Sequence, residues 1–199
     1  MVYQPPTGAR DLLPLDVAQK YWIEDRLQQV FHQWGYHRII TSTLERLDTL
    51  MAGGAIDRAT LLQLQAPDDE ALGLRPELTA SIARAVVSRI SPTAFPLRLY
   101  YTANVFRRAT EHSSTQQQEF YQAGIELLGA AGVAADAEVL LLLTDSLNRL
   151  ELPNCHLILG EAGLTRSLLS VFPPHLQVQV RQAIAQLDGL EKDYPVLAA

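Results

Sequence analysis

The chain has 199 residues, of which 48% are hydrophobic, so we expect one main globular core. Its formal net charge of −6 argues against a protein whose main task is to bind a nucleic-acid backbone, because phosphate contacts need clustered Lys and Arg. The single cysteine excludes an internal disulfide, and no Cys or His cluster has the spacing of a metal site. The N-terminus lacks a signal-peptide pattern and no apolar run is long enough to span a membrane, which predicts a cytoplasmic protein.

The first half of the chain predicts two helices separated by a strand. In residues 16–34 apolar side chains recur at the spacing of a helix buried on one side, with Asp16 placed to start a capping box. Residues 36–44 are rich in β-branched side chains and predict a strand. A second packed helix is expected over residues 79–90. Its buried face is expected to hold Ile82, Ala83, Val86, Val87 and Ile90.

The second half begins with two strand-like runs, residues 97–108 and 117–128, separated by a polar segment. This pattern predicts an antiparallel hairpin with a long loop. The later elements are expected to be a helix over 135–150, a strand near 156–159, and helices around 164–172 and 176–187. Together the elements indicate an α/β or α+β domain with a mainly antiparallel sheet flanked by helices.

One face of the second hairpin strand is unusually polar. Alternation places Gln122 and Glu126 on this face, roughly 13 Å apart along the strand, with Gly124 between them. A glycine inside a strand often marks the close approach of a ligand, and the neighbouring strand supplies Arg107, whose planar fork suits a carboxylate. The structural alternative is a solvent-exposed face on which Gly124 is a bulge.

The segment before the second helix also has two interpretations. Glu77 and Thr79 carry polar side chains that a ligand could use, but Thr79 could equally be a helix N-cap and Glu77 a carboxylate that compensates the helix dipole. No Ser/His/Asp relay and no glycine-rich phosphate loop is present, so we expect no catalytic residue and no cofactor. The residues alone predict a domain with a polar pocket of amino-acid size.

Several stretches, taken together, resemble histidyl-tRNA synthetase and its relatives, and they occur in that family's order over residues 5–170. The similar stretches are Pro6 to Pro14 (PTGARDLLP), the helix reaching Trp34-Gly35-Tyr36 with the strand ending at Glu45 (class II motif 1), Leu74 to Thr79 (LRPExT), and Val105-Phe106-Arg107 with residues 119–129 (motif 2). The resemblance implies a class II aminoacyl-tRNA-synthetase-like core over residues 1–172, which dimerises through motif 1. Residues 173–199 would form a helical segment after this core.

The resemblance also implies a histidine site. Carried over residue by residue, Glu77, Thr79 and Gln122 would hold the ammonium group of histidine. Arg107 would bind its carboxylate, and Glu126 would read the imidazole. The polar strand face and the family pattern therefore select the same side chains.

The chain departs from the synthetase pattern at positions that matter for ATP and tRNA. Ser42 stands where motif 1 has proline, and Ala109 stands where the synthetases have a glutamate for adenine, although Glu111 could substitute if the loop is shifted. The loop over residues 109–118 has no Lys or Arg, so it lacks attraction for either polyanion. No motif 3 arginine is present to stabilise the phosphate charge that develops in adenylation.

This combination resembles the family of regulatory subunits of ATP phosphoribosyltransferase, the first enzyme of histidine biosynthesis. It implies a non-catalytic chain that binds the short-form catalytic subunit as partner and histidine as effector. The chain would form a homodimer within a hetero-oligomer, and would bind neither tRNA nor a membrane. The alternative is a fragment of a histidyl-tRNA synthetase.

Overall fold

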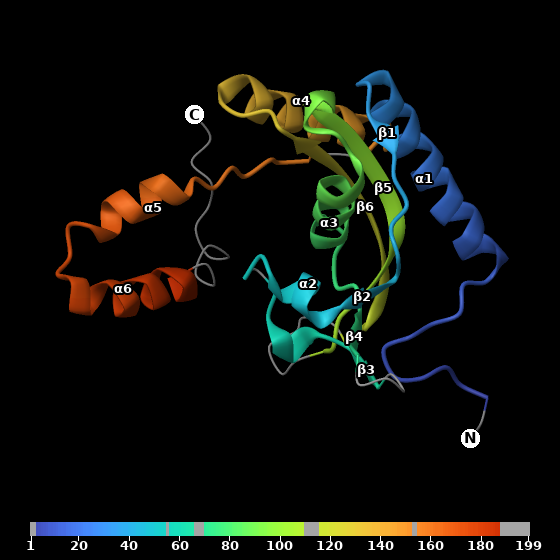
Figure 1. Ribbon diagram of the computed structural model, residues 1–199, viewed down its shortest axis with the longest axis horizontal. Helices are drawn as coiled ribbons and strands as arrows, with labels where there is room; N and C mark the ends of the chain where they lie inside the picture. Colours follow the sequence, from blue (N-terminus) through green and yellow to red (C-terminus); the bar gives the residue numbers. More distant parts are fainter. Residues whose placement is uncertain (1–2, 55, 66–69, 110–115, 153–154, 188–199) are drawn as a thin grey trace. The chain divides into compact units, whose positions relative to one another are not determined.

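The computed structural model describes residues 3–54, 56–65, 70–109, 116–152 and 155–187, which belong to two compact units, Met1–Pro153 and Asn154–Ala199 (Figure 1). No helix among the described residues is long and apolar enough to cross a membrane, and these residues contain no cluster of three or more metal-binding side chains.

A long antiparallel hairpin forms the centre of the first unit. Strands β5 (Leu97–Phe106) and β6 (Glu119–Leu128) pair without interruption from Leu97↔Leu128 to Phe106↔Glu119. The short strand β1 (His37–Arg38) pairs parallel with β5, which gives the order β1-β5-β6. The hairpin predicted from the alternation of side chains is therefore confirmed, and its continuous register leaves no bulge at Gly124.

Helices cover the two faces of this sheet. Helix α3 (Thr79–Arg89) packs on one face, where its buried Ile82 and Val86 meet Tyr101 and Val105 of β5. Helices α1 (Pro14–Gln33) and α4 (Val133–Arg149) pack against the other face. Figure 1 shows α3 and α1 on opposite sides of the hairpin. The expected arrangement of a mainly antiparallel sheet flanked by helices is confirmed.

A second, smaller sheet lies at the entrance to α3. Its three antiparallel strands have the order β2-β4-β3. The elements of this region are β2 (Leu44–Arg46), α2 (Leu47–Met51), η1 (Arg58–Thr60), β3 (Gln63–Gln65) and β4 (Ala71–Leu74). A separate short 3-10 helix, η2 (Pro92–Ala94), connects α3 to β5. Because β4 runs directly into α3, this small sheet fixes the segment that carries Glu77 and Thr79.

The strand expected over residues 36–44 is only partly present. The chain forms β1 and β2, but residues 39–43 between them belong to no strand. The buried guanidinium of Arg75 explains this difference, because its Nη1 donates to the carbonyl oxygens of Thr41 and Ser42 at 2.9 and 3.2 Å. The same side chain donates through Nε to the carbonyl of Asn104 in β5 at 2.9 Å.

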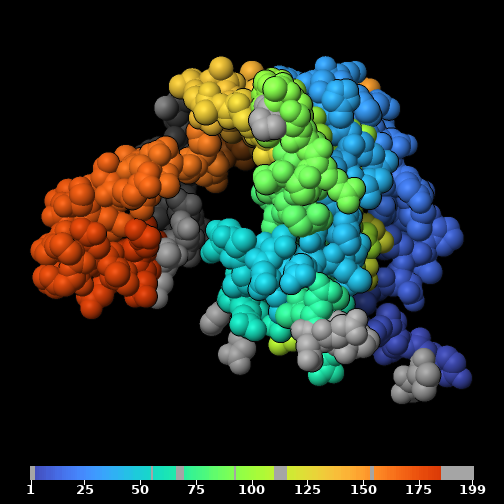
Figure 2. All heavy atoms as spheres, viewed as in Figure 1, coloured from blue at the N-terminus to red at the C-terminus, as the bar shows by residue number. Residues whose placement is uncertain are grey.

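Two helix details differ from expectation: Asp16 takes part in a capping box as the third helical residue and not as its start, and the buried face of α3 is narrower than expected. Helix α1 begins at Pro14, whose fixed φ suits the first helical position, and the Asp16 carboxylate accepts the backbone N–H of Leu13 at 3.0 Å from within the first turn. In α3 the buried stripe follows Ile82 and Val86, four residues apart, whereas Val87 is 86% exposed. Figure 2 shows the outer surface of α3, in green, facing solvent.

The second unit contains helices α5 (Ala162–Leu169) and α6 (Pro174–Leu187), which contact each other. The strand predicted near 156–159 is absent, and Ile158 is 88% exposed. An apolar run forms a strand only when another strand accepts its backbone hydrogen bonds, and the described part of the chain supplies none there. The division expected after residue 172 falls between α5 and α6, and the extent of the class II core stays a prediction.

Candidate functional site

The polar face of β6 lies on the side of the sheet that α3 covers. Gln122, Gly124 and Glu126 stand opposite Ala103, Tyr101 and Leu99 of β5, and these three partners pack into the core beneath α3. Gln122 and Glu126 are each half-buried. The face is therefore not the open, fully hydrated surface of the structural alternative, and its polar side chains need partners inside a partly dry site.

Two carboxylates and a hydroxyl meet where α3 begins. The Thr79 hydroxyl donates to Glu126 Oε1 at 2.6 Å, which joins the first turn of α3 to the middle of the sheet. The Glu77 carboxylate accepts the backbone N–H groups of Thr79 and Ala80 at 2.6 and 3.0 Å. Glu77, rather than Thr79, therefore satisfies the helix N-terminus, and the same bonds fix its charge at the edge of the site.

The electrostatic state of Glu126 reflects this crowding. Burial raises the pKa of Glu126 above its usual range, and although the hydrogen bond from Thr79 opposes this shift, the nearby charge of Glu77 adds to it. Both burial and a like charge penalise the ionised form. A cationic or hydrogen-bond-donating group between the two carboxylates would relieve the penalty, so the arrangement suits an ammonium or an imidazole N–H.

Arg107 follows directly after β5 and supplies the positive charge at this site. Its Nε donates to the carbonyl of Pro76 at 2.8 Å, and its guanidinium lies 5.2 Å from the centre of the Phe120 ring. Within the described residues its two Nη groups make no hydrogen bond, so they are available to an anionic group. The guanidinium is thus held beside the Glu77 segment by one bond while its fork stays open.

Gln122 contributes an acceptor that has no donor. Its Oε1 is buried, yet no described residue hydrogen-bonds to it. A buried acceptor without a donor costs free energy, roughly 1 to 3 kcal/mol. A ligand ammonium would supply the missing donor.

The structure corrects the expected role of Gly124. The space above this glycine is occupied by the side chain of Tyr101, because a Cβ atom at Gly124 would lie 2.5 Å from the Tyr101 hydroxyl oxygen. The glycine therefore first makes room for a tyrosine from the neighbouring strand and does not leave an empty space for a ligand. Sequence reasoning missed Tyr101, although the cross-strand pair Tyr101↔Gly124 follows once the hairpin register is known.

Tyr101 is 5% exposed and close to both carboxylates. Burial, together with the charges of Glu126 and Glu77, raises its pKa to about 12, while Arg107 acts in the opposite direction. The phenol is therefore uncharged at neutral pH. The structure thus brings Glu77, Arg107 and Glu126 close to Tyr101. Thr79 is joined to Glu126 by a hydrogen bond, and Gln122 lies farther along the same face of β6.

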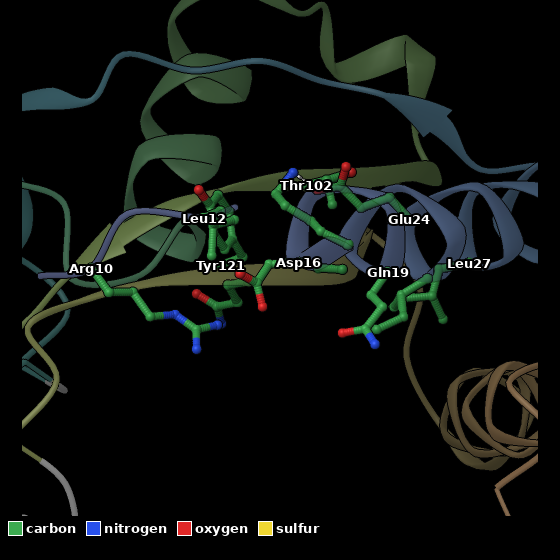
Figure 3. A pocket seen from close by; sticks show the side chains of 12 residues that line it. Arg10, Leu12, Asp16, Gln19, Glu24, Leu27, Thr102 and Tyr121 are labelled. Carbon is green, nitrogen blue, oxygen red and sulfur yellow. Dashed lines mark hydrogen bonds and ion pairs between the residues drawn. The ribbon is translucent and has the colours of Figure 1, made fainter. Parts of the chain in front are cut away.

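Two pockets border this region on opposite sides of the sheet. The larger, about 680 Å³, is mainly apolar, lies between α2 and α3, and has Glu77 and Thr79 in its wall. The smaller, about 440 Å³, lies between α1 and the opposite face of the hairpin, where Thr102 and Tyr121 form its floor (Figure 3). Only the first pocket adjoins the two-carboxylate cluster.

The segments expected to distinguish this chain from a synthetase lie at the end of the hairpin. Ala109 is the last described residue before the loop, and residues 110–115, including Glu111, lie outside the described residues. The expectation that adenine recognition is lost therefore stays a prediction. Ser42 lies in the irregular segment before β2, where its carbonyl accepts from Arg75.

Comparison with known proteins identifies related chains. The family model for histidyl-tRNA synthetase matches residues 8–194. An ATP phosphoribosyltransferase regulatory subunit of Nostoc punctiforme is 68% identical over 193 residues, covering 97% of this chain and 48% of the relative. The corresponding subunit of a Cyanothece species is 63% identical over 188 residues, covering 94% and 47%. The chain thus spans about half the length of these curated relatives.

Solved structures agree with these matches. A Bacillus halodurans protein, described as an ATP phosphoribosyltransferase regulatory subunit/histidyl-tRNA synthetase, has a TM-score of 0.85 at 32% identity, covering 96% of this chain and 50% of that protein. The apo histidyl-tRNA synthetase of S. aureus has a TM-score of 0.61 at 27% identity, covering 74% and 34%. These likenesses confirm the class II synthetase-like fold predicted from the motif-like stretches.

Proposed function

The chain belongs to the histidyl-tRNA synthetase family, and from that premise we propose that it works as a regulatory subunit of ATP phosphoribosyltransferase, the first enzyme of histidine biosynthesis. In this role it catalyses nothing itself. It binds the short-form catalytic subunit, is needed for its activity, and reports the histidine concentration to it. The high identity to curated regulatory subunits supports this choice within the family.

The observation that carries the histidine-sensing role is the cluster of Glu77, Thr79 and Glu126, in which a hydroxyl of α3 bonds to a half-buried carboxylate of β6. Such a cluster is poorly satisfied without a ligand, because both carboxylates are close and one is desolvated. A cationic ligand between the two carboxylates would be stabilised by its attraction to both of them. The Nη groups of Arg107 could likewise bind the carboxylate of a ligand.

We assign the ends of histidine from these charges. The ammonium group contacts Glu77, Thr79 and the unpartnered acceptor of Gln122. The carboxylate lies on Arg107, and the imidazole N–H donates to Glu126. Every group of the zwitterion then meets a side chain of complementary charge or hydrogen-bonding capacity.

Regulation requires that histidine bind one state of the complex better than another. The coupling free energy in such systems is typically about 1 to 3 kcal/mol, and it is reciprocal between the two sites. Histidine should therefore change the affinity at the coupled site of the catalytic subunit by about 5- to 150-fold. We propose a cytoplasmic hetero-oligomer in which this chain forms a homodimer, without tRNA as a partner.

A second candidate is a piece of a histidyl-tRNA synthetase, which the matching family model and the S. aureus structure favour. The two functions differ in one assay. A synthetase catalyses histidine-dependent ATP-pyrophosphate exchange, whereas a regulatory subunit does not. Exchange clearly above a blank with the full-length protein would replace the regulatory assignment.

The direct test is reconstitution. The full-length protein is expected to co-purify with a short-form phosphoribosyltransferase, to restore its activity, and to make that activity sensitive to histidine. The matched control is Glu126→Gln, which should still co-purify and activate but should respond only to much higher histidine concentrations. Loss of co-purification with the unmodified protein would contradict the proposed partnership.

A further inference from the structure

We propose that Arg75 is a positioning residue that holds Glu77 and Arg107 in their places at the site and couples both of them to residues 39–43. This role rests on the proposed histidine site, and it adds no contact between Arg75 and the ligand. Arg75 follows directly after β4, two residues before Glu77, and its side chain is 6% exposed.

The guanidinium of Arg75 joins two segments that are far apart in the sequence. Its Nε donates to the carbonyl of Asn104 in β5 at 2.9 Å. Its Nη1 donates to the carbonyls of Thr41 and Ser42 at 2.9 and 3.2 Å. All three acceptors are backbone atoms, so these bonds fix the path of the main chain in both segments.

The main chain of Arg75 repeats this connection. Its N–H donates to the carbonyl of Thr43 at 3.1 Å, and its carbonyl accepts the N–H of Phe106 at 3.0 Å. Residues 41–43 and the end of β5 are therefore bonded to both the side chain and the main chain of one residue. A movement of residues 39–43 must either displace Arg75 or break several hydrogen bonds together.

The next two residues carry the position of Arg75 into the site. The carbonyl of Pro76 accepts Nε of Arg107 at 2.8 Å. The carboxylate of Glu77 accepts the first amides of α3 at 2.6 and 3.0 Å. Because the ring of Pro76 fixes its φ, Arg75 and Glu77 cannot move independently. The group expected to bind a ligand carboxylate and one that is expected to bind its ammonium thus depend on the same residue.

The burial of this cation favours a role in geometry over a role in stability. Burial lowers the pKa of Arg75, and the nearby charge of Glu45 acts in the opposite direction. Glu45 itself is ion-paired with Arg84 of α3 at 2.6 Å. A buried charge adds little net stability even when it is well bonded. The contribution of the Arg75 bonds is then the fixed geometry that they impose on the site.

Positioning and binding are linked thermodynamically. Histidine binds best when Glu77 and Arg107 are held by Arg75, so bound histidine must in turn suppress the opening of the Arg75 bonds, because coupling free energies are reciprocal. Residues 39–43 should therefore become more ordered when histidine binds, although they lie outside the proposed contacts.

The first test is a double-mutant cycle in the full-length protein with Arg75→Lys and Arg107→Ala, in which titration calorimetry gives the histidine affinity. Lysine keeps the charge, but its single nitrogen cannot take the places of Nε and Nη1 at once. We expect Arg75→Lys to weaken histidine binding about tenfold alone and about threefold in the Arg107→Ala background, because part of its effect passes through Arg107. A silent Arg75→Lys, or the same loss in both backgrounds, would overturn the proposal.

Arg98→Lys is the matched control. Arg98 also makes two side-chain bonds, from Nε and Nη2 to the carboxylate of Glu138 at 2.7 Å, but on the face of the sheet that α4 covers. This variant should lower stability without changing histidine affinity. Equal losses of histidine affinity in Arg75→Lys and Arg98→Lys would show a general effect on the fold and would overturn the positioning role.

The second measurement needs no substitution and decides the question if Arg75→Lys does not fold. Hydrogen exchange of the unmodified full-length protein is followed by mass spectrometry with and without saturating histidine. Peptides from residues 39–46 should exchange more slowly with histidine, whereas peptides from α4 should not change. Unchanged exchange over residues 39–46 would contradict the coupling. If the unmodified protein does not bind histidine, the site fails together with this role, whereas normal binding with a silent Arg75→Lys removes only the role of Arg75.

Discussion

Replacing Glu126 by Gln is expected to change stability and ligand affinity in opposite directions. Glutamine keeps the size of the side chain and can still accept the Thr79 hydroxyl, but it removes the anionic acceptor for the imidazole. A hydrogen bond to a charged group contributes roughly 1.5 to 3 kcal/mol. Since each 1.4 kcal/mol is a factor of ten, histidine affinity should fall about 10- to 150-fold.

The same substitution should stabilise the ligand-free protein at neutral pH. Burial holds the pKa of Glu126 above its usual value of 4.5, with a further increase from Glu77, so the folded state binds this proton more tightly than the unfolded state. Ionisation of Glu126 therefore lowers stability at pH values above its folded pKa, and this penalty disappears as the pH falls to the unfolded pKa. Glutamine cannot ionise and avoids the penalty.

Two measurements check this pair of expectations. Calorimetric titration with histidine gives the affinity, and urea unfolding without ligand at pH 7 and pH 4 gives the stability. The variant should be more stable than the unmodified protein at pH 7, and the difference should shrink at pH 4. Unchanged histidine affinity together with lower stability at pH 7 would refute the view that Glu126 is a strained ligand-binding carboxylate.

Four further substitutions test the site and two ion pairs of the fold. Arg107→Ala should weaken histidine binding at least as much as Glu126→Gln does. It should change the melting temperature little, because the guanidinium is exposed and makes one bond to Pro76. Calorimetry should show the loss of affinity for histidine but not for histamine, which lacks the carboxylate. Gly124→Val should abolish binding and lower the free energy of unfolding by about 1 to 3 kcal/mol, because its Cβ collides with Tyr101; unchanged stability in urea would contradict this packing. Arg84→Ala should lower the free energy of unfolding by about 1 to 3 kcal/mol, because it leaves the buried carboxylate of Glu45 without its ion-pair partner at 2.6 Å. Lys20→Ala breaks an ion pair within one helix and should lower the free energy of unfolding by less than about 1 kcal/mol in the same experiment.

The elements that could be predicted are those in which apolar side chains recur regularly because another large element packs against one face. The alternation along β6 was readable because α3 and the opposite helices bury its two faces differently. The predicted strand at 156–159 failed because an apolar run of that length does not reveal whether a partner strand exists. Val87 was wrongly assigned to the buried face of α3 for a related reason. The apolar stripe expected for a helix is about 100° wide, but the actual contact with the sheet is narrower and leaves Val87 exposed.

The site shows the same division between local and nonlocal information. The resemblance and the strand period both select Gln122 and Glu126, and the structure joins Glu126 to the first turn of α3 through the Thr79 hydroxyl. Tyr101 was missed because its role depends on which residue of β6 stands opposite, and the register of a hairpin with a long loop cannot be read from side-chain alternation. The sequence offers Thr79 as the helix N-cap and Glu77 as a carboxylate that compensates the helix dipole. In the structure it is Glu77 that accepts the first amides of α3, and these bonds are compatible with ligand binding as well.

The most direct test of the regulatory role measures phosphoribosyltransferase activity in a mixture of the full-length protein and a short-form catalytic subunit, with and without histidine. We predict that activity appears only when both chains are present, that histidine inhibits it, and that Glu126→Gln moves the inhibition to at least tenfold higher histidine. Activity that is independent of this chain, or inhibition that is identical in the variant, would contradict the account.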